Sequence, residues 1–178
     1  IEILIVISVF ALTLGIIYGS YSLSQKAYKE VETTTEINQN ARVILERITR
    51  EIRQAKEIVT ELSDEEPIES VSPELGIMFE DGHIEEQYHY IRYFKDNNNI
   101  KKQVIVYYFS GSPDTFVPYN AIPPETETLE NIILEEKIIG EYIVGIKFWG
   151  EEVINISIIL EKKDKNINFR TKIFARNI

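Results

Sequence analysis

The chain has 178 residues, no Cys and a formal net charge of −10, and 44% of its residues are hydrophobic. This length fits one ordinary domain, and a composition with 27% charged and 11% aromatic residues excludes a disordered tail and a collagen-like chain. The absence of Cys excludes a disulfide scaffold, a thiolate zinc site and a cysteine nucleophile. The acidic balance argues against a general nucleic-acid binder, so no nucleic-acid partner is expected.

The amino-terminal residues predict a membrane-spanning helix. Residues 3–25 contain no charged side chain, and about 20 apolar residues are enough to cross a bilayer as a helix. A cleaved secretory signal would have a shorter apolar core, basic residues before it and an Ala-x-Ala site after it. Here Lys26 and Lys29 follow the run instead, so we expect a retained transmembrane helix over residues 1–25.

Two features of this segment suggest contacts with other helices. Ala11, Gly15 and Gly19 recur every four residues and therefore lie along one ridge, where small residues allow close helix packing in lipid. Gly is also common in membrane helices generally, which is the alternative explanation. Glu2 stands at the start of the apolar run, where a charge either has a partner or reaches the headgroup level.

The helical pattern continues beyond the membrane segment as an amphipathic half, residues 26–59. Pairs of opposite charge at a spacing of four, such as Arg42 with Glu46, would lie on its wet face. A continuous helix over residues 1–59 would be about 90 Å long. Its apolar residues recur every three or four positions and predict one buried stripe: Ile37, Ala41, Ile44, Ile48, Ile52, Ala55 and Val59. Of these, Ile37, Ile44, Ile48 and Ile52 are the predicted helix–sheet core.

Residues 60–178 predict an antiparallel β-sheet domain that packs on this helix, which makes the fold class α+β. Strands rich in Ile, Val, Tyr and Phe are expected at residues 87–95, 102–110, 142–149, 154–160 and 167–173. Polar clusters at residues 96–99 and 161–165 predict turns, so the last two strands should form a hairpin. Residues 110–127 hold four of the six Pro and predict a loop.

Residues 61–86 carry ten Asp or Glu and no Lys or Arg. The simplest interpretation is a solvated loop region. A carboxylate calcium site is the alternative, although no Asp-x-Asp-x-Asp-Gly ligand loop is present.

Nothing in the sequence predicts catalysis. The only histidines are His83, in the acidic region, and His89, in a strand run. No phosphate-binding loop, dinucleotide fingerprint or nucleophile elbow occurs. We therefore expect no catalytic residues, no cofactor and no metal, and a protein that is not an enzyme.

Two segments carry a family resemblance: IEILIVISVFALTLGIIYGSYSLSQKA at residues 1–27 and NARVILERITREIRQAKEI at residues 40–58. They resemble the amino-terminal helix of type IV pilins and type II secretion pseudopilins. Residues 44–55, ILERITREIRQA, are most similar to the J-type minor pseudopilin and the W-type minor pilin. The resemblance implies a pilin-like fold, with a long helix packed on an antiparallel sheet.

The same resemblance implies how the chain would act. In the family, prepilin peptidase removes a basic leader and the new terminus is methylated; both positions would precede Ile1. Glu2 would pair with the amino terminus of a neighbouring subunit. The implied partners are other minor and major pilins or pseudopilins, through the amino-terminal helix, and the inner-membrane assembly platform. The expected function is a minor structural subunit at or near the tip of a type II secretion or type IV pilus filament, helping to initiate assembly.

The expected location is the cytoplasmic membrane, with a single pass and the globular domain outside the cytoplasm, followed by assembly into a periplasmic or surface filament. The alternative is a bitopic membrane protein with an extracytoplasmic binding or sensor domain. An amphipathic half that follows the membrane segment without a linker favours the filament subunit.

Overall fold

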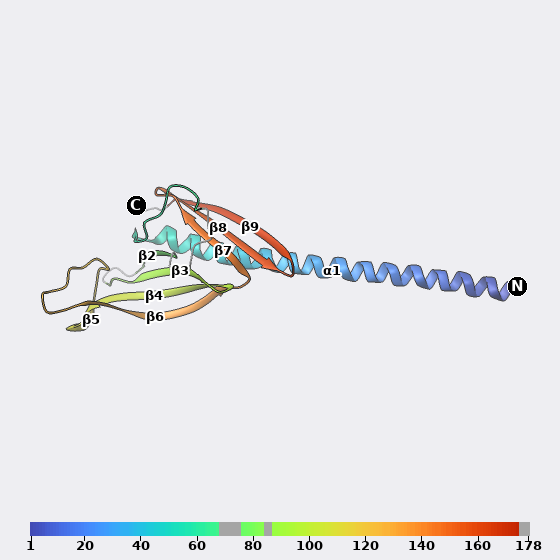
Figure 1. The fold of residues 1–178 in the computed structure, drawn as a ribbon, viewed down its shortest axis with the longest axis horizontal. Coiled ribbons are helices and arrows are strands. Elements are labelled where there is room, and N and C mark those ends of the chain that lie inside the picture. The colour runs from blue at the N-terminus through green and yellow to red at the C-terminus, as the bar shows by residue number, and fades with distance from the viewer. Residues whose placement is uncertain (68–75, 84–86, 175–178) are drawn as a thin grey trace.

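A computed structural model describes residues 1–67, 76–83 and 87–174. These residues form one long helix and antiparallel β-sheets, which confirms the α+β class. Figure 1 shows the helix leaving the β domain as a bare rod, with the amino terminus at its far end. The carboxy-terminal half of the helix lies between two sheets.

Helix α1 covers Glu2–Gln54 without interruption, and 53 residues at 1.5 Å each make it about 80 Å long. It passes through Gly15 and Gly19 as continuous helix. It ends five residues before the predicted limit at residue 59. Ala55 has left the helical conformation with ψ 143°, and the amide of Lys56 donates to the carbonyl of Glu80 at 3.0 Å. The chain then continues as a strand, because its backbone groups pair with the sheet instead of with the preceding turn.

The first sheet has six strands, and every pairing in it is antiparallel. They are β1 (Glu57–Ile58), β2 (Ile77–Glu80), β3 (Tyr90–Asp96), β4 (Asn99–Phe109), β5 (Ser112–Val117) and β6 (Leu129–Gly140). Strand β4 is central: β3 and β5 pair along one side of it, and β6 pairs along the whole of the other side. The β3–β4 hairpin turns at the predicted polar cluster, with Asn97 at a positive φ of 52°.

The second sheet has three strands in the order β7 (Ile143–Trp149), β8 (Val153–Lys162) and β9 (Lys165–Phe174). The predicted hairpin is present as β8–β9, closed by the pair Lys162 and Lys165. Its two turn residues, Lys163 and Asp164, both have positive φ, which is the geometry that matches the twist of a two-residue hairpin.

The core lies where the helix meets both sheets. Ile37, Ala41, Ile44, Ile48 and Ile52 of α1 are each at most 1% exposed. They share one apolar cluster with residues of both sheets, among them Ile77, Phe79, Tyr93, Ile100, Phe148, Ile156, Ile158 and Leu160. Strand β6 reaches the helix at Gly140, where a Cβ atom would lie 2.1 Å from Cδ1 of Ile44. Only a residue without a side chain allows this approach.

Three expectations about the β domain were wrong. The strands form two sheets, because α1 presents apolar residues to both. The predicted loop over residues 110–127 contains β5, whose Pro113 is tolerated because β5 pairs on one side only. The acidic region contains β2, in which Glu80 is buried and paired with Lys56 at 2.7 Å. Residues 61–67 form a loop, as expected, and residues 68–75 and 84–86 lie outside the described residues.

Candidate functional site

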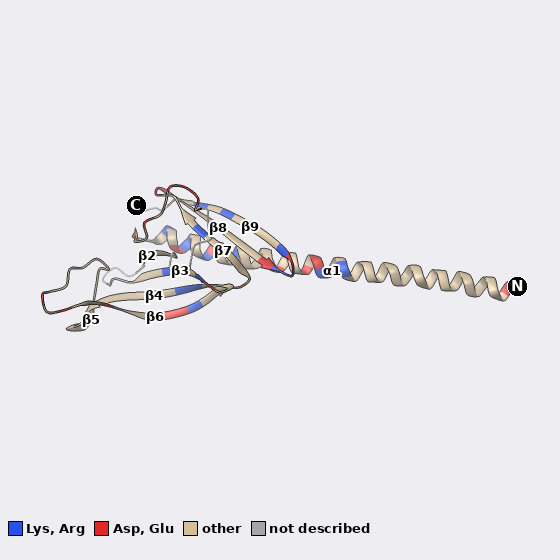
Figure 2. Cartoon of the chain, in the orientation of Figure 1, with Lys and Arg blue, Asp and Glu red and all other residues tan. Residues whose placement is uncertain are grey.

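The exposed part of α1 is the most unusual surface of the molecule, and we refer to residues 1–25 as the stem. This part of the described helix is long and apolar enough to cross a membrane. None of the residues in its most apolar stretch is buried against the rest of the protein. Large side chains such as Phe10 and Ile16 are 62% and 70% exposed. Figure 2 shows the stem free of charge along its length except at its start. A large exposed apolar surface marks a site of interaction with a membrane or with another protein.

Two hydroxyls in the first half of the stem are compatible with lipid. The hydroxyls of Ser8 and Thr13 donate to the carbonyls of Leu4 and Val9, four residues earlier, at 2.7 and 2.8 Å. These side chains therefore need no outside partner, which matters because an unsatisfied polar group in lipid is costly.

The structure places the candidate packing residues on open surface. A Cβ atom added at Gly15 or Gly19 would meet no atom within 4 Å. Glu2 lies in the first turn of α1, the end of a helix where the dipole favours a negative charge. Glu2 and the small residues Ala11, Gly15 and Gly19 are therefore accessible to another chain, and none of them touches the β domain.

A polar collar attaches the β8–β9 hairpin to α1 just above the stem. Lys165 donates to the carbonyl of Glu30 at 3.2 Å and to Oγ1 of Thr34 at 2.9 Å. Lys162 forms an ion pair with Glu36 and donates to the hydroxyl of Tyr142 at 3.0 Å. The hydrogen bond from Lys162 lowers the pKa of the Glu36 carboxyl, and the same contact raises the pKa of Lys162. The collar fixes the direction in which the stem leaves the domain.

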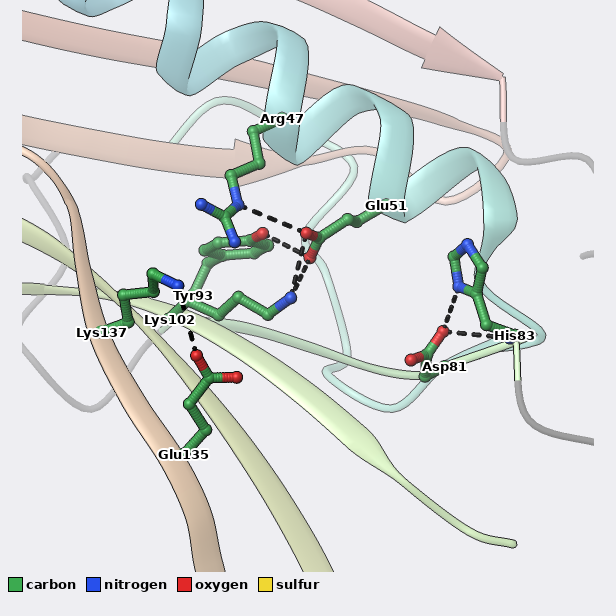
Figure 3. A network of polar contacts seen from close by, with 8 residues as sticks. All are labelled: Arg47, Glu51, Asp81, His83, Tyr93, Lys102, Glu135 and Lys137. Atoms are coloured by element: carbon green, nitrogen blue, oxygen red, sulfur yellow. Dashed lines mark hydrogen bonds and ion pairs between the residues drawn. The ribbon is translucent and has the colours of Figure 1, made fainter.

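A second polar cluster attaches α1 to the first sheet, and Figure 3 shows its members converging on the Glu51 carboxylate. Nζ of Lys102, on β4, lies 2.9 Å from Oε2 of Glu51, and Nε of Arg47 lies 3.4 Å from Oε1 of Glu51. The Tyr93 hydroxyl donates to Oε2 of Glu51. The side chains of Glu51 and Lys102 are only 11% and 13% exposed. Burial, together with the hydrogen bond to Glu51, raises the pKa of Tyr93. Each charge in this cluster has a partner, so its role is to hold the helix on the sheet.

The histidines do not form a catalytic arrangement. His83 is exposed and its Nδ1 lies 2.6 Å from Asp81, as Figure 3 shows. His89 is 8% exposed and packs edge-on against Phe116. Among the described residues, no group of three or more His, Asp or Glu could hold a metal ion.

Comparison of the chain with protein-family models, with curated proteins and with solved structures gave no match. The functional argument therefore rests on the residues and their arrangement. Sequence reasoning identified the stem but missed the collar and the Glu51 cluster. The contacts that join α1 to the sheets there link residues 42 to 135 positions apart in the chain, and no local pattern brings them together.

Proposed function

We propose that this protein is a structural subunit of a membrane-anchored filament of the type IV pilus or type II secretion class. The observation that carries the proposal is the continuity of α1: one helix provides both the exposed apolar stem and the buried core of the β domain. The resemblance of residues 1–27 and 40–58 to pilins and pseudopilins points the same way.

Continuity has a mechanical consequence. The collar and the Glu51 cluster hold the amphipathic half of α1 between the sheets, so the stem cannot rotate independently of the domain. A receptor domain tethered to a membrane gains little from this rigidity, whereas a filament subunit needs it. When stems pack side by side, their positions then determine where the domains lie.

The stem also offers what packing in lipid requires. Ala11, Gly15 and Gly19 lie along one open ridge that would let a second helix approach closely. Glu2 would pair with the amino terminus of a neighbouring subunit and so fix the axial register, because only one stagger brings the two charges together. An ion pair is strong in low dielectric once both partners are already desolvated.

Within the filament, we place the subunit at or near the tip, as a minor pilin or pseudopilin that helps to initiate assembly. This position rests on the similarity of residues 44–55 to the J-type and W-type minor subunits. The subunit would enter the cytoplasmic membrane by a single pass, with the β domain outside, and would be handled by prepilin peptidase and the assembly platform.

The test is the variant Glu2→Leu in the native host, compared with wild type by immunoblot of membrane and sheared-filament fractions. The change makes the stem more apolar, so membrane insertion should be unchanged or improved, while incorporation into filaments should fall. Glu2→Asp keeps the carboxylate and is the matched control, with incorporation closer to wild type. Equal incorporation of Glu2→Leu and wild type would show that Glu2 has no pairing role. If wild type itself is found in the membrane fraction and never in the filament fraction, the bitopic sensor would be favoured.

A further inference from the structure

Two long strands of the β domain have an unpaired edge. Among the described residues, β6 pairs with β4 alone over its 12 residues, and β9 pairs with β8 alone over its 10 residues. The other edge strands are less open. Strand β1 has two residues, and β5 has six, one of which is Pro113 with no amide hydrogen to donate. Strand β7 begins against the β3–β4 turn, where its first amide donates to the carbonyl of Asn98 at 2.8 Å. A free edge presents a row of backbone donors and acceptors that another strand can pair with.

The two free edges carry opposite charge. Strand β6 contains three Glu and one Lys, whereas β9 contains two Lys, one Arg and no acidic residue. Figure 2 shows the acidic stretch of β6 and the basic positions of β9. Strand β6 also exposes apolar surface beside its charges: Ile132, Leu134 and Ile138 are 49%, 50% and 51% exposed. A partner strand that is basic and partly apolar would complement it.

The two strands cannot pair within one molecule. Figure 1 shows β9 on one side of α1 and β6 on the far side of the other sheet. Any contact between them must therefore join two molecules.

The direction of each strand relative to the stem selects the pairing. Strand β6 ends near the stem, since Gly140 lies against Ile44, and β9 begins near the stem, since Lys165 contacts Thr34. Thus β6 runs toward the stem and β9 away from it. Two copies anchored in one membrane have parallel stems, so β6 of one copy meets β9 of the other antiparallel, which is the more stable ladder. Two β6 strands or two β9 strands would run parallel and would bring like charges together.

We propose that β6 of one copy pairs edge-to-edge with β9 of a second copy of this chain. Thr34 and Ile44 are ten residues apart along α1, so aligning the stem-side ends of the two strands shifts the copies by about 15 Å along the helix axis. Such a contact joins different surfaces of identical chains, and it therefore repeats along an open assembly. The inference goes beyond the proposed function and rests only on its membrane-anchored stem. The tip position would then hold a short run of copies.

Because these 178 residues contain no Cys, cross-linking can test the contact directly. Lys137→Cys and Asn168→Cys chains, with different tags, are co-expressed in the native host and treated with a short bis-maleimide. Both positions are exposed, and they lie opposite each other when Gly140 of one copy is aligned with Lys165 of the other. We expect the mixed dimer to exceed either same-variant dimer, and one chain carrying both changes to give a ladder of oligomers. Pairing Asn168→Cys with Glu151→Cys, in the exposed β7–β8 turn, is the control for random collision.

Charge reversal tests the recognition. Glu135 would lie opposite Arg170 and diagonal to Lys172 of the other copy, so Glu135→Lys should lower the cross-linking yield about five-fold or more, because it turns an attraction into a repulsion. Arg170→Glu with Lys172→Glu should do the same, and all three changes together should restore the yield. Unchanged melting of each variant in detergent shows that the fold is intact. Failure of the variant with all three changes to recover the yield would contradict the charge argument.

A cross-link between the stems of two copies distinguishes failure of this inference from failure of the proposed function. Ala11→Cys chains should cross-link to each other when the stems of two copies pack together. Cross-linking through Ala11→Cys without any through Lys137→Cys and Asn168→Cys would overturn the strand pairing and leave the filament proposal standing. Absence of both cross-links, together with absence of the chain from the sheared-filament fraction, would overturn both.

Discussion

The variant Ile48→Ala, which removes the side chain beyond Cβ, is the sharpest test of how the helix holds the domain together. Ile48 is completely buried in the apolar cluster between the sheets. Truncating a buried Ile to Ala costs about 2–5 kcal/mol, because apolar contacts are lost and a cavity is left. For a chain of this length each kcal/mol lowers the melting temperature by about 2–4 °C. Ile48→Ala should therefore lower it by about 4–20 °C.

Val43→Ala is the matched control. Val43 lies on the same helix but is 60% exposed, and both changes replace a β-branched residue by Ala, so their gains in helix propensity are similar. The control should stay within about 0.5 kcal/mol of wild type. Melting is followed on the full chain in detergent by the fluorescence of Trp149, the only Trp. Equal melting shifts for the two variants would refute a core built on this face of α1.

Two further predictions concern contacts of the helix with each sheet. Gly140→Ala should lower the free energy of unfolding, measured by chemical denaturation, by about 1–3 kcal/mol, because its Cβ would meet Ile44. In an Ile44→Val background, which lacks Cδ1, the same change should lower the free energy of unfolding by less. Lys162 lowers the pKa of Glu36, so this contact stabilises the fold fully above the ordinary carboxyl value of 4.5 and loses its effect as pH falls through the lowered value. The difference in melting temperature between wild type and Glu36→Gln should be constant at neutral pH and shrink toward zero in acid; a difference that persists in strong acid would contradict the collar.

The helix and the hairpin were accessible from sequence because local patterns determine them. Apolar residues at helical spacing, such as Ile44 and Ile48, reflect the face that a helix can bury. Polar turn residues between two alternating runs are enough to produce the β8–β9 hairpin. The end of α1 was not accessible, because neither Gly nor Pro marks it. It is set by a backbone bond from Lys56 to Glu80, 24 residues away.

Strand β6 shows a second limit of the sequence. Its run Ile132, Ile133 and Leu134 lacks alternation, and the structure leaves all three about half exposed at a sheet edge. Period-two patterns arise where one face is buried and the other is wet, so an edge strand without that contrast gives no signal. The Glu51 cluster was missed for another reason: its partner Lys102 lies on a strand 51 residues later, and only the packed fold brings them together.

The continuity of stem and domain is the central claim, and a flexible insertion tests it most directly. Six Gly and Ser residues placed after Lys29 would keep the stem, the collar and the β domain but uncouple the orientation of the stem from that of the domain. Wild type and insertion variant are expressed in the native host, and membrane and sheared-filament fractions are compared by immunoblot. The account predicts equal amounts in the membrane, wild type in the filament fraction and little or none of the insertion variant there. Incorporation of the insertion variant at the wild-type level would contradict it.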